Sequence, residues 1–469
     1  RQMLRRRFDR IEVIDLRGDV RRGPRGDVEH DEGVFNVMVG TSITLAIADG
    51  TRGDREALVT YYDCWRHGQF SRTEKLSRLV QGSAEGVLPG AIEVDRSDLD
   101  DFRPKPFSTG EWIALPEAFA YHVGGMQTKR NAFVYDHDRE TLVRRIRRFH
   151  SQPLDSVRDE FQETRDRTAS AAHAQSFQDA YVKRTAFRPL DVRFRYRHPA
   201  FGDFLRPALQ AAWGNGNVGL YTHRFGVGLG PAVMAHSLMP DYDLWSGRGG
   251  YSFPLYDRRP ESRPLNLKPE LVAALTDAYG VAVTPDQVFD AILCLLSARS
   301  YTRRFAEDLE DVFPHVPFPS SPDVFAQAAR IGAEIRTVET FARPPAEPYR
   351  QIARADTAPR GPLAPIEQLV DNGFALCADG SGRISNVPTE VWEFAVSGYR
   401  VLPRWLAARE GEIGPNFIPE MRDVAQRIAE LLFLFGEADT ILDATLADSL
   451  TREALGVAAE DAQPDDEQD

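Results

Sequence analysis

A strict alternation of arginines and aromatic residues is the feature that most constrains how this chain can fold. The segment RFRYR places an arginine at every second position, Arg193, Arg195 and Arg197, with Phe194 and Tyr196 between them. Successive side chains of a β-strand point to opposite faces of a sheet, so this period of two predicts a strand with three arginines on one face. Like charges on one strand face repel each other unless an anion or an acidic group lies nearby.

These arginines belong to a basic island inside an acidic protein. Between residues 183 and 206 seven basic side chains accompany only two acidic ones, whereas the whole chain has a formal net charge of −13. The basic residues are Lys183, Arg184, Arg188, Arg193, Arg195, Arg197 and Arg206, and the island also contains Phe187, Phe201 and Phe204. Arginine can bind phosphate or read guanine, and aromatic rings can stack on bases, so the island indicates contact with nucleic acid. A solvated edge strand is the alternative interpretation.

Three glycine-containing segments offer further candidates. GNGNVGLYTHRFGVGLG carries Arg224 at its centre, and SGRGG carries Arg248. Because glycine permits close approach of the backbone, both loops predict an arginine that reaches a base edge in a groove. GGMQTKRNAF offers polar residues directly after two glycines, namely Gln127, Thr128, Lys129 and Arg130. Hairpins or surface turns without chemistry remain the alternative for all three.

Composition narrows the class of protein. A length of 469 residues predicts two to four domains, and no apolar run is long enough for a transmembrane helix. Three scattered cysteines, Cys64, Cys294 and Cys377, predict neither a disulfide framework nor a zinc cluster and favour a reducing cytoplasm. The histidines and carboxylates show no metal-ligand spacing. Six acidic residues and no basic one in residues 459–469 predict a disordered tail.

Apolar patterning predicts α/β structure at the start of the chain and helices towards its end. Buried strands are expected over 11–18, 34–40, 42–48 and 57–65, joined by loops that suggest antiparallel pairing at a sheet edge. Ser71 and Glu74 form a predicted capping box for a helix over 71–80. Further helices are expected over 140–150, 285–313, 321–341 and 421–439. The arginines of the 140–150 helix favour a solvated face over a phosphate-binding ridge.

Five segments, in order, resemble the C-terminal part of adenine-N6 DNA methyltransferases, above all the single-polypeptide (type ISP) restriction–modification enzymes. The segments are FDRIEVIDLRGDVRR with VFNVMVGTSITLAI, then YYDCWRHGQFSRTEKLSRL, GGMQTKRNAFVYD, FRPLDVRFRYRHP with LYTHRFGVG and GYSFPLY, and VWEFAVSGYRVLPRWLAAR. They cover about residues 8 to 410. In the resembling enzymes the GGMQTKRNAF loop lies close to the active site and to substrate DNA. In VSGYRVLPRWLAAR, apolar and aromatic residues recur at helical spacing, which favours a packed core: Tyr399, Leu402, Trp405 and Leu406.

The family's catalytic motifs do not occur in this sequence. There is no Asn/Asp-Pro-Pro-Tyr/Phe tetrapeptide, which holds the flipped adenine in the family, and no glycine-containing loop for the methyl donor, S-adenosylmethionine. A phosphate loop of the type GxxxxGK[ST] is also absent from the sequence. Arg1 reads like the middle of an element. The resemblance therefore implies that S-adenosylmethionine and catalysis belong to an N-terminal methyltransferase half or a partner subunit, and no catalytic or metal-binding residue is assigned in this chain.

The expected fold is mixed α/β and α+β. Residues 1–85 would form the end of a Rossmann-like methyltransferase sheet, 86–182 a connecting region with a basic helix, and 183–345 the core of a target recognition domain. Residues 346–458 would form its mainly helical C-terminal part, before the tail. The expected function is sequence-specific recognition of double-stranded DNA in an anti-phage restriction–modification system. The alternative is a non-catalytic scaffold subunit of a defence complex.

The missing donor motifs generate a first prediction. Isothermal titration of the purified chain with S-adenosylmethionine should give no saturable heat, because neither the donor loop nor the adenine-pocket motif is present. Stoichiometric binding at micromolar concentration would show that this interpretation of the fold is wrong.

Overall fold

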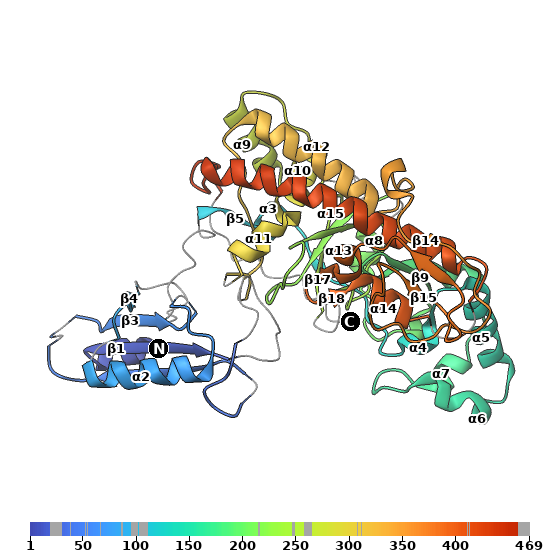
Figure 1. The fold of residues 1–469 in the computed structure, drawn as a ribbon, viewed down its shortest axis with the longest axis horizontal. Helices are drawn as coiled ribbons and strands as arrows, with labels where there is room; N and C mark the ends of the chain where they lie inside the picture. Colours follow the sequence, from blue (N-terminus) through green and yellow to red (C-terminus); the bar gives the residue numbers. More distant parts are fainter. Residues whose placement is uncertain are drawn as a thin grey trace. The chain divides into compact units, whose positions relative to one another are not determined.

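The structure, a computed structural model, contains two compact units, shown in Figure 1. Unit 1 consists of Arg1–Gly110 with Arg303–Asp308, and unit 2 of Glu111–Thr302 with Leu309–Asp469. The described residues are 1–18, 31–37, 39–51, 53, 55–65, 67–85, 88–94, 102, 111–213, 216–245, 249–257, 265–306, 308–310, 312–409, 411 and 413–457. The acidic tail predicted at 459–469 lies outside them. The finer division of residues 111–458 stays a prediction.

Unit 1 contains a four-stranded sheet in the order β2-β1-β3-β4. Its elements are α1 (Gln2–Arg7), β1 (Arg10–Arg17), β2 (Thr41–Ile47), β3 (Leu58–Asp63), α2 (Arg72–Glu85) and β4 (Ile92–Glu93). β2 is antiparallel to β1 and β4 to β3, as expected, but β1 and β3 run parallel. The predicted strand at 34–40 was wrong, because its described residues form bends and no strand. Ser71 and Glu74 do form the capping box that begins α2, with the Ser71 amide donating to Glu74 Oε2 at 2.9 Å.

Unit 2 is built around several small antiparallel sheets. The described residues include sheets in the orders β11-β10-β12-β6, β7-β9-β8 and β14-β16-β15, and the pairs β13-β5 and β17-β18. The strands are β5 (Ile113–Ala114), β6 (Val123–Gly124), β7 (Tyr135–Asp136), β8 (Val182–Arg188), β9 (Asp191–Tyr196), β10 (Gly219–Thr222), β11 (Met234–His236), β12 (Tyr251–Pro254), β13 (His315–Val316), β14 (Arg354–Ala355), β15 (Phe374–Ala375), β16 (Arg383–Ser385), β17 (Ala395–Val396) and β18 (Tyr399–Arg400). The mixed α/β class expected from the sequence is confirmed.

The same part of the chain contains the remaining helices. They are α3 (Leu115–Ala118), α4 (Asn131–Val134), α5 (Arg139–Ser151), α6 (Leu154–Val157), α7 (Ala169–His173), α8 (Pro207–Trp213), α9 (Pro269–Tyr279), α10 (Pro285–Ser297), α11 (Arg299–Arg304), α12 (Pro322–Glu339), α13 (Thr389–Glu393), α14 (Val401–Ala407) and α15 (Phe417–Ala447). The helix predicted over 285–313 ends early, because Ala298 adopts an extended ψ of 129° and separates α10 from α11. Among the described residues, no helix combines the length and apolar character needed to cross a bilayer.

An aromatic core lies between α5 and the sheet β7-β9-β8. Leu142, Ile146 and Phe149, the predicted apolar face of α5, are fully buried in it. The island residues Tyr196 and Phe201 belong to the same cluster, with their ring centroids 5.0 Å apart. The aromatic residues of the basic island are therefore largely core residues.

The helices α10, α12 and α15 pack together into a layer of unit 2, visible in yellow to red in Figure 1. α10 and α12 approach so closely that a Cβ added to Gly332 would lie 1.7 Å from the carbonyl oxygen of Asp290. Only glycine fits at that crossing, because any larger residue would force the two helices apart.

Gly332→Ala should therefore lower the free energy of unfolding by about 1–3 kcal/mol or more, the usual range for overpacking a core. Chemical denaturation of the full chain measures this change. Gly361→Ala is the matched control, because nothing lies within 4 Å of its added Cβ, and it should leave stability nearly unchanged. Equal effects of both substitutions would contradict the packing argument.

Candidate nucleic-acid interface

The basic island forms the hairpin β8–β9, in which β9 is the strand that the alternating pattern predicted. β9 lies between β7 and β8 in the sheet, with Arg195 opposite Tyr135 on one side and Lys183 on the other. A central strand has neighbours along both edges, and here α5 and the aromatic core cover one of its faces. The solvated edge strand considered from the sequence is therefore not what this segment forms.

The three alternating arginines are not an open cationic face. Arg195 is 1% exposed, and its guanidinium donates to Met126 Sδ at 3.1 Å and lies 5.5 Å from the centroid of the Tyr135 ring. Arg197 is half-buried and donates to Met239 Sδ at 3.0 Å. Burial lowers the pKa of Arg197, and the neighbouring positive charge of Arg195 lowers it further. Direct contact of Arg195 with DNA is thus incompatible with this conformation.

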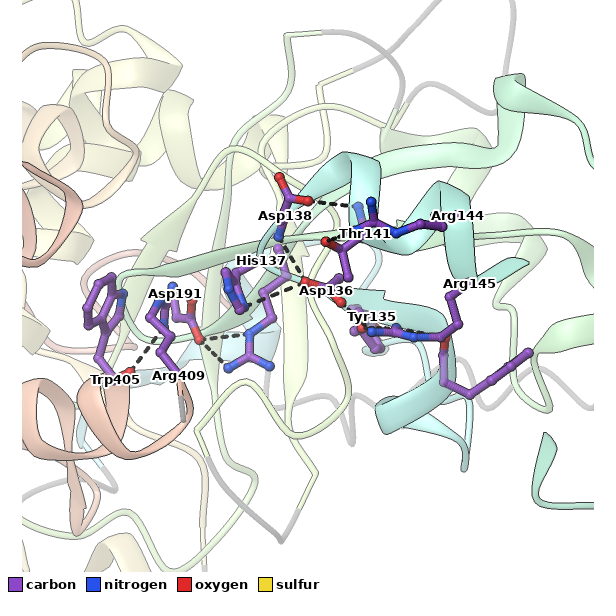
Figure 2. Close-up of polar contacts among 12 residues, drawn as sticks. Tyr135, Asp136, His137, Asp138, Thr141, Arg144, Arg145, Asp191, Trp405 and Arg409 are labelled. Atoms are coloured by element: carbon purple, nitrogen blue, oxygen red, sulfur yellow. Dashed lines mark hydrogen bonds and ion pairs between the residues drawn. The ribbon is translucent and has the colours of Figure 1, made fainter. Parts of the chain in front are cut away.

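Arg193 has a buried acidic partner, Asp191, which it shares with a distant arginine. Arg193 and Arg409 bind opposite oxygens of Asp191 at 2.9 and 2.7 Å, and Figure 2 shows Arg409 reaching Asp191 from beside Trp405. Burial opposes ionisation of Asp191, but the charges of Arg409 and Arg193 outweigh it and lower the pKa of the carboxyl group. Asp191 therefore stays charged and supplies the anion that the repelling arginines required.

Arg188, at the end of β8, is also paired with a buried acidic residue. Its guanidinium lies 3.1 Å from Asp241 Oδ1 and 4.2 Å from the centroid of the Phe187 ring. The other oxygen of Asp241 accepts a hydrogen bond of 2.7 Å from the Tyr135 hydroxyl. Like Arg193, Arg188 keeps only a small exposed fraction, 17% of its side chain.

The loop between β6 and α4 contains one buried and one exposed cation side by side. Arg130 is 1% exposed, and it pairs with Asp203 at 2.9 Å and donates to the carbonyl of Phe201 at 3.1 Å. The pKa of Arg130 is lowered, because the effect of burial outweighs the opposing effect of the Asp203 carboxylate. Lys129 is exposed at a positive φ of 58°, with its ammonium 5.1 Å from the centroid of the Phe204 ring.

The neighbours of these two cations fix the loop. The Gln127 amide donates to the Phe204 carbonyl and the Phe204 amide to the Gln127 carbonyl, both at 3.0 Å. Thr128 is fully buried, and its hydroxyl donates to Asn131 at 2.6 Å. Of the four predicted residues, Lys129 and the half-buried Gln127 can therefore reach a ligand, while Thr128 and Arg130 hold the loop in shape.

Arg224 lies on the loop between β10 and β11. It is exposed, and its guanidinium has no hydrogen-bond or acidic partner among the described residues. The loop around it is anchored: the amide of Gly226 donates to the Leu309 carbonyl at 2.7 Å, and that of Gly228 to Ser397 Oγ at 3.0 Å. Gly230, at a φ of 111°, comes so close to the β17–β18 hairpin that a Cβ would lie 2.4 Å from the Ala395 carbonyl oxygen.

The remaining sequence predictions concern Arg248, the basic helix α5 and metal binding. Arg248 lies outside the described residues, so its placement stays a prediction. In the basic helix α5, Arg145 pairs with Asp136 and donates hydrogen bonds to two backbone carbonyls, whereas Arg144 is exposed (Figure 2). No cluster of metal-ligating side chains occurs in the part of the chain that the structure describes.

One exposed residue and the acidic partners of the arginines were not predicted from the sequence. Phe225, beside Arg224, is 55% exposed but was not singled out. Its only signal was its place next to an arginine in a glycine-rich segment. Asp203 and Asp241 carried no signal of their own, because they meet Arg130 and Arg188 from positions 73 and 53 residues away in the chain.

With this geometry in place, comparison with known proteins identifies the class: specificity domains of restriction–modification enzymes. The Type ISP C-terminal specificity domain family matches residues 117–416, more than half of the sequence. The chain therefore belongs to this family, which confirms the resemblance drawn from the five sequence segments. No curated protein sequence matches the chain.

Solved structures show the same fold at low sequence identity. The chain is similar to a nuclease-deletion mutant of the Type ISP restriction–modification enzyme LlaGI in complex with a DNA substrate mimic, with 16% identity, a TM-score of 0.62, and coverage of 92% of this chain and 37% of that chain. It is also similar to the ATP-dependent Type ISP enzyme LlaBIII bound to DNA, with 16% identity, a TM-score of 0.64, and coverage of 95% and 31%. A DrdV–DNA complex matches with 16% identity, a TM-score of 0.58, and coverage of 93% and 47%. The chain thus spans less than half the length of each of these proteins.

The contrast between Lys129 and Arg130 gives a matched test of the buried pair. Arg130→Met should lower the free energy of unfolding by about 3–5 kcal/mol, because it leaves the charge of Asp203 buried without a partner. Lys129→Met removes an exposed cation one residue away and should leave stability within about 0.5 kcal/mol. Denaturant titration of both variants measures the difference. An Arg130→Met protein as stable as the unaltered chain would contradict the argument that the buried pair holds the loop.

Proposed function

We propose that this chain recognises a specific sequence in double-stranded DNA as the target recognition part of a restriction–modification enzyme. The observation that carries the proposal is the match of residues 117–416 to the Type ISP C-terminal specificity domain. The structural relatives support it, because LlaGI, LlaBIII and DrdV were each solved with DNA or a DNA mimic. A protein with this role would act in the cytoplasm.

Among the predicted residues, the geometry favours the exposed cations on fixed loops as DNA contacts. Lys129 and Arg224 combine an exposed charged group with a backbone anchored by hydrogen bonds. Because the backbone of a fixed loop is already ordered, binding has to order only the side chain, which favours affinity and register. We therefore assign Lys129 to a phosphate and Arg224 to a base edge, with Gln127 and Arg248 as further candidates. Arg193, Arg195, Arg197 and Arg188 would act indirectly, by holding the hairpin and loops in position.

We further propose that methyl transfer requires residues outside this sequence. The sequence lacks the Asn/Asp-Pro-Pro-Tyr/Phe motif and the donor loop, so S-adenosylmethionine would be held by an N-terminal methyltransferase half or by a partner subunit. This division of labour would leave the present chain with the choice of target. A scaffold subunit without sequence preference is the rival.

Selection from a random duplex library separates recognition from the scaffold role. The purified chain should enrich a short motif, and Arg224→Ala should weaken binding to that motif by about 1–3 kcal/mol and relax the preference at one base pair. Lys129→Ala should weaken all duplexes alike and reduce the log–log salt slope by about 0.9. Arg354→Ala, which removes an exposed arginine from β14, is the control and should change neither quantity. Enrichment of no motif by the unaltered chain would leave the scaffold role in its place.

A further inference from the structure

The tip of the β10–β11 loop presents an exposed aromatic ring on a rigid support. Phe225 is 55% exposed, whereas the residues two positions before and after it, His223 and Val227, are 3% and 5% exposed. Only Arg224 and Phe225 stand fully out from this part of the loop, and Gly226 behind them is half-buried. An apolar ring left in water on an otherwise buried turn indicates a surface meant for a partner.

Residues before and after the tip anchor the β10–β11 loop. Before the tip, the His223 ring packs against Trp245 with centroids 5.3 Å apart, and Thr222 Oγ1 donates to the Ala232 carbonyl at 2.7 Å. After the tip, the amides of Gly226 and Val227 both donate to the Leu309 carbonyl, at 2.7 and 3.2 Å. The exposure of Phe225 is therefore a consequence of an anchored backbone, and no rearrangement within the described residues is needed to present it.

The neighbouring charge identifies the chemistry of the partner. Arg224 has no acidic or hydrogen-bonding partner among the described residues, and Phe225 makes no ring contact there. An exposed guanidinium beside an exposed ring matches a polyanion whose interior is made of stacked aromatic faces, which is a nucleic-acid duplex. A purely apolar protein surface would leave the guanidinium of Arg224 without a counterpart.

We infer that Phe225 is a wedge that enters one base step of the bound duplex, while Arg224 contacts a base edge beside it. This inference rests on the proposed function. It adds a second way to select a DNA sequence, which depends on how easily each base step of the DNA deforms. Steps that unstack easily, such as TA and CA, cost less to open, so a wedge favours them without any hydrogen bond to a base. Because the Phe225 side chain carries no charge, the wedge does not contribute to the salt dependence of binding.

Fluorescence of 2-aminopurine, which rises when the base loses its stacking neighbours, tests the wedge directly. The base is placed in turn at each adenine of a duplex that the unaltered chain binds, and binding should brighten one position. Phe225→Ala should abolish that brightening and weaken binding about tenfold, equivalent to about 1.4 kcal/mol, while the log–log salt slope stays unchanged. Phe225→Leu should keep part of the brightening, because leucine also serves as a wedge.

The control and the contrary outcomes keep this inference separate from the proposed function. Phe433→Ala removes a ring of 57% exposure from α15 and should alter neither affinity nor fluorescence. Thermal unfolding should be nearly the same for all variants, since both rings are largely in water. Binding without brightening at any position, or unaltered binding by Phe225→Ala, overturns the wedge and leaves DNA recognition intact. Failure of the unaltered chain to bind any duplex overturns DNA recognition itself.

Discussion

The arrangement of unit 2 depends on the ionised carboxylate of Asp191. It lies between Arg193 of the same strand and Arg409, which follows α14 and is 218 residues away in the sequence. Both Asp191 and Arg409 are almost completely buried, so neither charge could be tolerated there alone. The pair therefore fixes the β8–β9 hairpin against the C-terminal part of the unit. Two further pairs of a buried carboxylate and an arginine hold the adjoining loops in the same way, namely Asp203 with Arg130 and Asp241 with Arg188.

These pairs explain why the sequence predicted the strand correctly but not the surroundings of its arginines. The alternation in RFRYR is a local property, and it sufficed to place β9. Exposure depends on what covers the strand, and the covering groups come from α5, the segment after β11 and the residues beyond α14. A basic island thus resembles a nucleic-acid surface in sequence even where several of its arginines are buried or paired with acids inside the protein.

The helices were more predictable than the loops. The apolar face of α5, the capping box of α2 and the long helix α15 follow from periodicity and capping residues within a few turns. The break between α10 and α11 was missed, because apolar periodicity continues across it while the backbone turns at Ala298. At the candidate interface, the exposed state of Arg224 and Lys129 agrees with their predicted role, but the exposure of Phe225 required the structure.

The anchoring of the β10–β11 loop has a consequence for how such proteins diversify. Backbone hydrogen bonds hold its flanks, and its glycines lie against the β17–β18 hairpin, whereas the side chains of residues 224 and 225 are exposed. Under the proposed function, substitutions at these two positions would therefore alter the preferred target at almost no cost in folding. A lineage under pressure from changing DNA could explore new specificities at the tip while the scaffold beneath it stays the same.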